Sequence, residues 1–311
     1  MTRSLLSIAQ LSAPELDALL SRTLELFEAP SSASSALRGL PISLLFYENS
    51  TRTRLSFEAA IRALGGSPQS LALSASSVQK GETLSDTALN LIALGTQGLV
   101  LRHPVAGTPK LLASLTALHG IPVLNAGDGM HAHPTQALLD AATLMHDWKG
   151  PLSGRHVLII GDIRHSRVAR SNLELLPRLG VKVTICGPGP LLPSEVELSS
   201  FRGIEKAKFL TQELLRSVDA VMVLRLQLER QAKGFFPSVT EYRHFWGLTR
   251  DRAALLKSAA LILHPGPTNP GIEIDAEVMT DPRSRILKQV QIGVAARIAA
   301  LEWAFASGGT A

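Results

Sequence analysis

The chain has 311 residues, a length typical of two medium-sized domains. Hydrophobic residues make up 45% and charged residues 18%, which excludes wholesale disorder and collagen-like sequence. Lysine and arginine number 31 against 26 acidic residues. These cations are spread along the chain rather than clustered, which favours small anionic substrates over nucleic acid.

The single cysteine, Cys186, excludes an intrachain disulfide and a multi-cysteine zinc site. No apolar run approaches the roughly 20 residues that a membrane span needs. The segment Ser12-Ala-Pro-Glu15 predicts the capped start of a helix rather than a signal peptide. We therefore expect a cytoplasmic protein that binds neither membrane nor nucleic acid.

In the first half of the chain, short apolar runs alternate with helical patterns. The predicted strands cover residues 42–47, 98–101 and 121–125. The predicted helices cover residues 51–64, 83–94, 108–119 and 134–148. Such alternation favours a parallel sheet with crossover helices.

A break at Lys149-Gly-Pro-Leu-Ser-Gly154 precedes a second set of elements. Strands are predicted at residues 156–161, 181–186, 220–224 and 260–264, with a helix ending near residue 179 and a long last helix over about 285–305. We therefore expect two doubly wound parallel-sheet α/β domains. The first comprises residues 1–148 with the terminal helix, about 285–311, packed back on it, and the second comprises residues 149–284. Ligands of such sheets bind beyond the carboxyl ends of the strands, so the active site is expected in the cleft between the domains.

The first cluster of candidate functional residues is Ser50-Thr51-Arg52-Thr53-Arg54, where a predicted strand is followed by a helix. Helix N-termini offer unpaired N–H groups and partial positive charge. Arginine adds forked donors that match phosphate oxygens. The cluster predicts a phosphate site, and the alternative is a capped surface helix with solvated arginines.

The second cluster ends in His133-Pro-Thr-Gln136. Pro134 suits a first helical position, which puts His133 at the strand-to-helix turn and Gln136 one turn on. Two other interpretations stay open here. Gly127-x-Gly129-x-x-Ala132 resembles a loose dinucleotide fingerprint, and His131-x-His133 would suit a metal pair in an amidohydrolase.

Cations recur at predicted strand ends and helix starts: Arg52, Arg54, Arg102, Arg164, Arg167 and Arg225. Together they predict a site for substrates that carry several negative charges. Lys80 lies in a polar loop, where taken alone a solvated lysine is the commoner outcome. His264-Pro-Gly-Pro267 forms a rigid turn at another strand end.

Four of these segments resemble motifs of the transcarbamoylase family: Ser50-Thr-Arg-Thr-Arg54, Lys80-Gly-Glu-Thr83, His133-Pro-Thr-Gln136 and His165-Ser-Arg-Val-Ala-Arg-Ser171. The resemblance runs from about residue 46 to residue 297 and is strongest to the family's aspartate-using catalytic chains. It implies transfer of the carbamoyl group of carbamoyl phosphate to L-aspartate, giving N-carbamoyl-L-aspartate and phosphate, an early step of pyrimidine biosynthesis. It implies no metal and no cofactor.

The resemblance also implies roles for individual residues. Carbamoyl phosphate would be bound by Ser50, Thr51, Arg52, Thr53, Arg102, His133, Gln136, Gly266 and Pro267. Of these, the catalytic contacts would come from His133, Arg102, Thr53 and Arg52. His133 would polarise the carbamoyl oxygen and Gln136 would hold the amide. Aspartate would be held by Lys80, Arg167, Arg225 and Gln227.

The resemblance implies a homotrimer in which Lys80 and Ser76, or its neighbour Ser77, reach a neighbouring subunit's site. It leaves open a larger assembly with regulatory or dihydroorotase chains, and it names no protein base for the amine proton. One departure concerns Asn269-Pro270-Gly271, where the family often has Asn-Arg-Gly, so the conformation of that loop is an open question.

Three rival functions remain. Ornithine enzymes of the family carry Ser-Met-Gly where this chain has Leu226-Gln227-Leu228, and His-Cys-Leu-Pro where it has His264-Pro-Gly-Pro267, which favours aspartate. A metal-dependent amidohydrolase would depend on His131 and His133. A nucleic-acid binder would fit the pI of about 9.6 but needs clustered cations and stacking aromatics.

Overall fold

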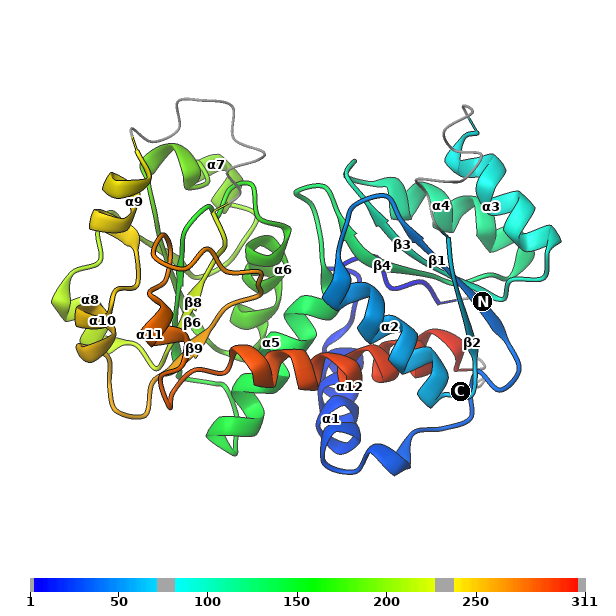
Figure 1. Ribbon diagram of the computed structural model, residues 1–311, viewed down its shortest axis with the longest axis horizontal. Coiled ribbons are helices and arrows are strands. Elements are labelled where there is room, and N and C mark those ends of the chain that lie inside the picture. The colour runs from blue at the N-terminus through cyan, green and yellow to red at the C-terminus, as the bar shows by residue number, and fades with distance from the viewer. Residues whose placement is uncertain (1–2, 72–81, 227–237, 307–311) are drawn as a thin grey trace. The chain divides into compact units, whose positions relative to one another are not determined.

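The computed structural model describes residues 3–71, 82–226 and 238–306 (Figure 1). The chain divides into two compact units. Unit 1 comprises residues 1–142 and 290–311, and unit 2 comprises residues 143–289. Within the described ranges, no helix is both long and apolar enough to cross a membrane.

In the described part of unit 1, four parallel strands form one sheet in the order β2-β1-β3-β4. The strands are β1 (Pro41–Phe46), β2 (Ser67–Ser70), β3 (Gly98–His103) and β4 (Val123–Asp128). The chain passes from β1 to β2 on one side and returns to β3 on the other. The direction of winding therefore reverses between β1 and β3.

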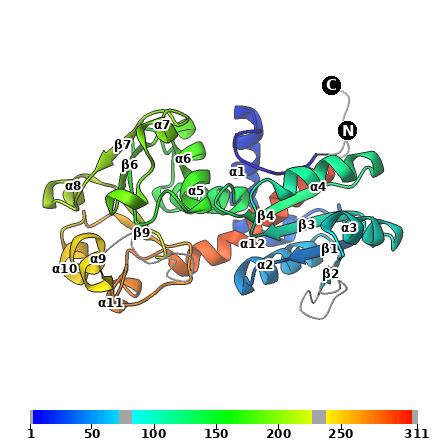
Figure 2. The ribbon, with the colours of Figure 1, turned by 90° about the horizontal axis from the view of Figure 1, so that it is seen from above.

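Helices cover both faces of this sheet. The α-helices of unit 1 are α1 (Ala13–Glu28), α2 (Thr51–Ala63), α3 (Leu84–Ala93) and α4 (Thr108–Thr116), with the first part of α5 (Pro134–Trp148) and most of α12 (Ile286–Phe305). On one face, Leu91 of α3 and Leu112 of α4 pack on Leu99 and Leu101. On the other, α2 and α12 lie side by side, with the Arg297 guanidinium 5.2 Å from the centroid of the Phe57 ring (Figures 1 and 2).

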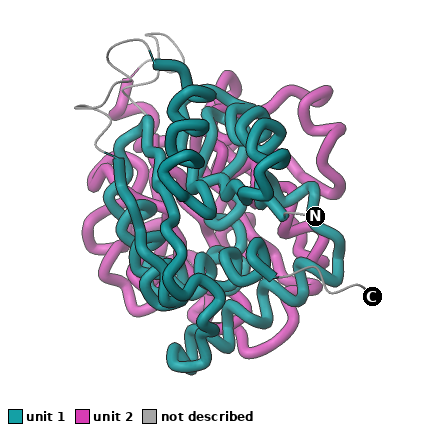
Figure 3. The backbone as a smooth tube through the Cα atoms, turned by 90° about the vertical axis from the view of Figure 1, so that its right-hand side faces the viewer, with its two compact units in different colours: residues 1–142, 290–311 teal, residues 143–289 magenta. Residues whose placement is uncertain are grey.

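In the described part of unit 2, five parallel strands follow the order β7-β6-β5-β8-β9. They are β5 (His156–Ile160), β6 (Lys182–Cys186), β7 (Ile204–Ala207), β8 (Ala220–Val223) and β9 (Leu261–Leu263). Winding reverses between β5 and β8. The expectation of two parallel-sheet α/β domains is thus confirmed, and the tube in Figure 3 distinguishes the two units by colour.

The helices of unit 2 are short: α6 (Arg167–Leu175), α7 (Glu195–Leu198), α8 (Gln212–Ser217), α9 (Val239–Trp246), α10 (Arg250–Ala254) and α11 (Ala276–Met279). Leu215 of α8, Tyr242 of α9 and Val278 of α11 join one buried cluster with Val221 and Val223 of β8. This cluster fixes the strands whose carboxyl ends carry the arginines of unit 2.

Local signals in the sequence are reproduced at several helix ends. The Ser12 hydroxyl and the Glu15 carboxylate form the expected capping box at α1, and Thr83 with Asp86 forms another at α3. The predicted helix over 108–119 instead ends at Thr116 and continues as a three-ten turn, Ala117–His119, which Gly120 terminates with a φ of 70°.

Candidate active site

In each unit, several of the predicted site residues lie at the ends of the two strands between which the winding reverses. In unit 1 these are β1, followed by Ser50–Thr53, and β3, which carries Arg102 near its carboxyl end. In unit 2 they are β5, followed by Arg167, and β8, followed by Arg225. Such switch points are where open α/β sheets bind ligands, because the loops of adjacent strands diverge there.

Ser50 is the N-cap residue of α2, in an extended conformation with φ −159° and ψ 94°. Thr51, Arg52 and Thr53 form the first helical turn, where backbone N–H groups lack partners inside the helix. The Thr53 side chain is buried and Arg52 is exposed. The first turn of α2 therefore offers hydroxyls, backbone N–H groups and a guanidinium, which are donors suited to a phosphate group.

Arg102 lies beside Phe46 in the register of β1 and β3, so its guanidinium is close to the loop that leads into α2. Nη1 donates to the carbonyl oxygen of Ala126 in β4 over 3.2 Å. Nε lies 3.5 Å from Oε2 of Glu48, and both side chains are only 13% exposed. Glu48 is a neighbour of the site that the sequence did not reveal, although it stands two residues before Ser50.

Asp128 stabilises the turn between β4 and α5, which ends at His133. Its buried carboxylate accepts N–H groups of Gly107 at 2.7 Å and Ala132 at 3.0 Å, and the Asn125 amide at 2.8 Å. The His131 ring lies 3.0 Å away through Nδ1. Burial acts to raise the pKa of the Asp128 carboxyl, but the hydrogen bonds from His131, Asn125 and Gly107 outweigh it and hold that pKa below its ordinary value.

Gly129 is needed in the same turn. Its φ is +47°, and a Cβ atom there would lie 2.8 Å from the backbone nitrogen of Ala106. The His131 ring, one half of the possible metal pair, contacts the Asp128 carboxylate. Over residues 3–71, 82–226 and 238–306, no three His, Cys, Asp or Glu side chains are grouped as a metal site would require.

His133 and Gln136 lie at the start of α5, and both are buried. The Gln136 N–H donates to the His133 carbonyl oxygen over 3.0 Å, and the side-chain Nε2 donates to Oδ1 of Asp140 over 2.9 Å. The adjacent carboxyl ends of β1, β3 and β4 thus bring the phosphate cradle, Arg102 and the start of α5 to one edge of one sheet.

In unit 2, the chain leaves β5 through Gly161, whose φ is +129°. A Cβ atom on this residue would lie 3.1 Å from Cβ of Leu224, so glycine permits the close approach of the β5 and β8 ends. Ser166 caps α6 by accepting the Ala169 N–H over 3.1 Å. Arg167 is therefore the first helical residue, and it is 6% exposed.

Arg225 follows β8 and is partly exposed. The next strand, β9, leads into residues 264–267, where the Gly266–Pro267 peptide is cis. In the Asn269-Pro270-Gly271 segment, the Asn269 side chain donates to the Leu226 carbonyl oxygen and to Glu273, each over 3.1 Å. The 264–271 loop is thereby tied to the segment that carries Arg225.

Some predicted residues fall elsewhere. Ser76, Ser77, Lys80 and Gln227 lie outside the described residues. Arg54 and Arg164 are exposed and pair on the surface with Glu58 at 4.0 Å and Glu197 at 3.2 Å.

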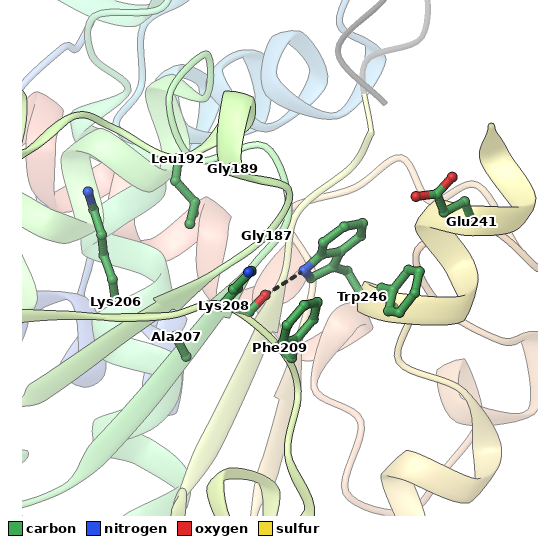
Figure 4. A pocket seen from close by; sticks show the side chains of 10 residues that line it. Gly187, Gly189, Leu192, Lys206, Ala207, Lys208, Phe209, Glu241 and Trp246 are labelled. Atoms are coloured by element: carbon green, nitrogen blue, oxygen red, sulfur yellow. Dashed lines mark hydrogen bonds between the residues drawn. The ribbon is translucent and has the colours of Figure 1, made fainter. Parts of the chain in front are cut away.

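A pocket of about 520 Å³ lies in unit 2 beside α9 (Figure 4). Phe209, Phe245 and Trp246 form an apolar wall, and Lys206 and Lys208 also line it. The Trp246 Nε1 group donates to the Lys208 carbonyl oxygen over 3.2 Å. The lining includes none of the predicted site residues, so this pocket does not mark the candidate active site.

Comparison with known proteins matches both units. Residues 3–146 match the family model for the carbamoyl-phosphate-binding domain of aspartate/ornithine carbamoyltransferase, and residues 153–304 match that for its Asp/Orn-binding domain. A Maricaulis maris protein named aspartate carbamoyltransferase catalytic subunit is 46% identical, covering 96% of this chain and 92% of its own length. A Myxococcus xanthus protein of the same name is 47% identical, with 96% and 98% covered.

Solved structures of the same family are also similar to this chain. Aspartate transcarbamoylase from Trypanosoma cruzi, in complex with carbamoyl phosphate and aspartate, superposes with a TM-score of 0.86 at 30% identity, and 96% of each chain is covered. The same enzyme in complex with carbamoyl aspartate and phosphate gives a TM-score of 0.84 at 31% identity, with 96% of this chain and 94% of that chain covered.

Proposed function

This chain belongs to the aspartate/ornithine carbamoyltransferase family, and we infer that it transfers the carbamoyl group of carbamoyl phosphate to the amine of L-aspartate. The products are N-carbamoyl-L-aspartate and phosphate. Family membership replaces the amidohydrolase and nucleic-acid hypotheses, and within the family the named relatives favour aspartate over ornithine.

One observation carries the proposal: the switch point of each unit offers donors that match one substrate. Unit 1 presents a helix N-terminus, hydroxyls and Arg102, which suit a phosphate dianion. Unit 2 presents Arg167 and Arg225, which suit the two carboxylates of aspartate. We therefore propose that unit 1 binds carbamoyl phosphate and that unit 2 binds the amino acid.

The individual roles are part of the same proposal. Phosphate is bound by Ser50, Thr51, Arg52, Thr53 and Arg102, while Gly266 and Pro267 complete the site. His133 polarises the carbamoyl oxygen, and Gln136 accepts a hydrogen bond from the carbamoyl NH₂ group. Gln227 and Lys80 assist Arg167 and Arg225 with aspartate.

The chemistry follows from charge. The neutral amine attacks the carbamoyl carbon, and the tetrahedral intermediate then expels phosphate. Negative charge develops on the carbonyl oxygen, where preorganised donors from Thr53, Arg102 and His133 stabilise it more than they stabilise the ground state. The departing phosphate is a suitable acceptor for the amine proton, and no side-chain nucleophile takes part.

We also propose a cytoplasmic homotrimer acting early in pyrimidine biosynthesis. In this assembly Lys80 and Ser76, or Ser77, contribute to the site of a neighbouring chain. Regulatory or dihydroorotase chains are candidate further partners.

The direct test is a product assay with carbamoyl phosphate and a panel of amino acids. L-aspartate is expected to be the preferred acceptor, because two guanidiniums repel the cationic side chain of ornithine. Faster carbamoylation of ornithine than of aspartate at equal concentration would overturn the assignment of the acceptor. Absence of any carbamoylated product from folded protein would overturn the reaction itself.

A further inference from the structure

Gln136 and Asp140 lie one helical turn apart on α5 and share a buried hydrogen bond. Nε2 of Gln136 lies 2.9 Å from Oδ1 of Asp140, whose side chain is fully buried. Residues four apart on a helix meet on one face, so α5 itself holds the two groups together. None of the four family motifs quoted above contains Asp140.

The chemistry of this pair fixes the direction of the Gln136 amide. An ionised carboxylate only accepts hydrogen bonds, whereas an amide has one donating and one accepting end. The NH₂ end of Gln136 must therefore face Asp140. Its carbonyl oxygen Oε1 is then the end left to face a ligand.

Arg297 of α12 supplies a balancing positive charge. Its guanidinium is 4% exposed, donates from Nη1 to the Gly293 carbonyl oxygen over 2.7 Å, and lies over the Phe57 ring. Burial lowers the pKa of Arg297 to about 10, and the charge of Asp140 acts against that shift. Arg297 is therefore still a cation at neutral pH, and an adjacent cation favours the ionised form of a buried carboxyl group.

We propose that Asp140 is a positioning residue that presents the Gln136 carbonyl oxygen to the NH₂ group of the carbamoyl donor. The pair would thereby select an acyl phosphate that carries an amino group over one that carries a methyl group. This inference rests on the proposed function, because it gives Gln136 a carbamoyl ligand. A reversed Gln136 amide would direct its own NH₂ group at the substrate NH₂ group and lose the contact.

Acetyl phosphate is the probe, because it replaces the NH₂ group of carbamoyl phosphate by a methyl group of similar size. The quantity to measure is the ratio of the inhibition constant of acetyl phosphate to the KM of carbamoyl phosphate. In Asp140→Asn the amide partner no longer enforces one orientation of Gln136. The ratio is expected to fall about tenfold or more, the size expected when a polar group loses its hydrogen-bond partner.

Three further variants separate a positioning role of Asp140 from a purely structural one. Glu302→Gln makes the same carboxylate-to-amide change on α12, where Glu302 pairs with Arg22 at 2.7 Å, and it should leave the ratio unchanged. In a Gln136→Ala background, Asp140→Asn should no longer change the ratio, because Asp140 acts only through Gln136. If Asp140→Asn does not fold, Asp140→Glu retains the charge beside Arg297 but displaces the carboxylate, and it should lower the ratio in the same way.

The outcomes are distinct. An unchanged ratio in a folded Asp140 variant, with active wild type, overturns the positioning role and leaves the proposed reaction standing. A ratio that falls equally in Glu302→Gln also overturns it, because the effect would then be structural. Wild-type protein that forms no carbamoyl-aspartate overturns the proposed function itself.

Discussion

Nε2 of His264 lies 3.3 Å from Oε1 of Glu273, and both side chains are fully buried. The His264 Nδ1 atom accepts the Gly266 N–H over 2.8 Å, so the ring proton is on Nε2 and is donated to Glu273. The same carboxylate accepts the backbone N–H and the side-chain amide of Asn269. One acidic residue thus fixes the turn through Gly266 and Pro267.

The first prediction is that Glu273→Gln destabilises the fold. The carboxylate accepts three hydrogen bonds, two through Oε1 and one through Oε2, and the NH₂ group of glutamine would replace one of these oxygens. At least one buried donor would then lose its acceptor, so the free energy of unfolding should fall by about 1–3 kcal/mol. Urea denaturation measures this change in the free energy of unfolding. The matched control is Glu205→Gln, whose carboxylate is 59% exposed and pairs with Lys182, and which should change stability by less than about 0.5 kcal/mol. Equal effects of the two substitutions would show that Glu273 is not the organiser of the loop.

Arg52 and Arg54 offer a matched pair for the phosphate cradle, since both are exposed and lie in the first turns of α2. We expect Arg52→Ala to lower kcat/KM for carbamoyl phosphate by at least about a hundredfold, as loss of a charge-assisted transition-state contact does. Arg54→Ala, which loses only a surface pair with Glu58, should stay within about threefold of wild type. Steady-state kinetics measures kcat/KM for both variants, and circular dichroism checks that each variant is folded. Near-normal activity of Arg52→Ala would remove Arg52 from the phosphate site.

Asp128 predicts a dependence of stability on pH. Its folded-state pKa is lowered, so it stabilises the fold above the unfolded pKa of about 3.9, and this contribution is lost as pH falls through the folded value. We expect Asp128→Asn to be less stable than wild type at pH 7 by about 1–3 kcal/mol, through loss of buried hydrogen bonds. The difference should shrink below about pH 4.

Unfolding titrations at pH 7, 5, 4 and 3 measure this difference. The exposed residue Asp17 supplies the control, because Asp17→Asn should follow the wild-type curve at every pH. A difference between Asp128→Asn and wild type that is constant across these pH values would show that the carboxylate charge does not matter.

The sequence predicted the buried strands well because their apolar runs reflect burial on both faces. The two edge strands, β2 and β7, were not predicted, because their sequences SPQS and IEKA are short and contain no apolar run, as is typical of strands that are largely exposed. The predicted strand over residues 121–125 corresponds to β4, which continues to Asp128. Asn125 and Asp128 resemble turn residues, and only the structure shows that their side chains bond to one another at 2.8 Å.

The sequence motifs located the residues that are proposed to touch substrate, but not the residues that hold those side chains in position. Glu48 contacts Arg102 only once β1 and β3 are aligned, and Glu273 contacts His264 only once the segment between them folds back on itself. Asp140 was accessible in principle, because it stands four residues after Gln136 on a predicted helix. A second available signal was Arg297, an arginine flanked by apolar residues in the last helix, because a charged side chain at such a position indicates a buried partner.

The last prediction concerns sharing of the site between chains. If Lys80 of one chain completes the site that holds His133 of another, two inactive variants, Lys80→Ala and His133→Ala, should complement each other. After gentle dissociation, mixing at equal amounts and reassociation, about a quarter of the sites would combine an intact His133 with an intact Lys80, so about a quarter of wild-type activity should return. The matched control mixes His133→Ala with Arg52→Ala, whose lesions lie in the same unit of the chain, and it should restore nothing. Failure of the first mixture despite verified exchange of chains, or a monomeric mass at working concentration, would mean that each chain holds a complete site.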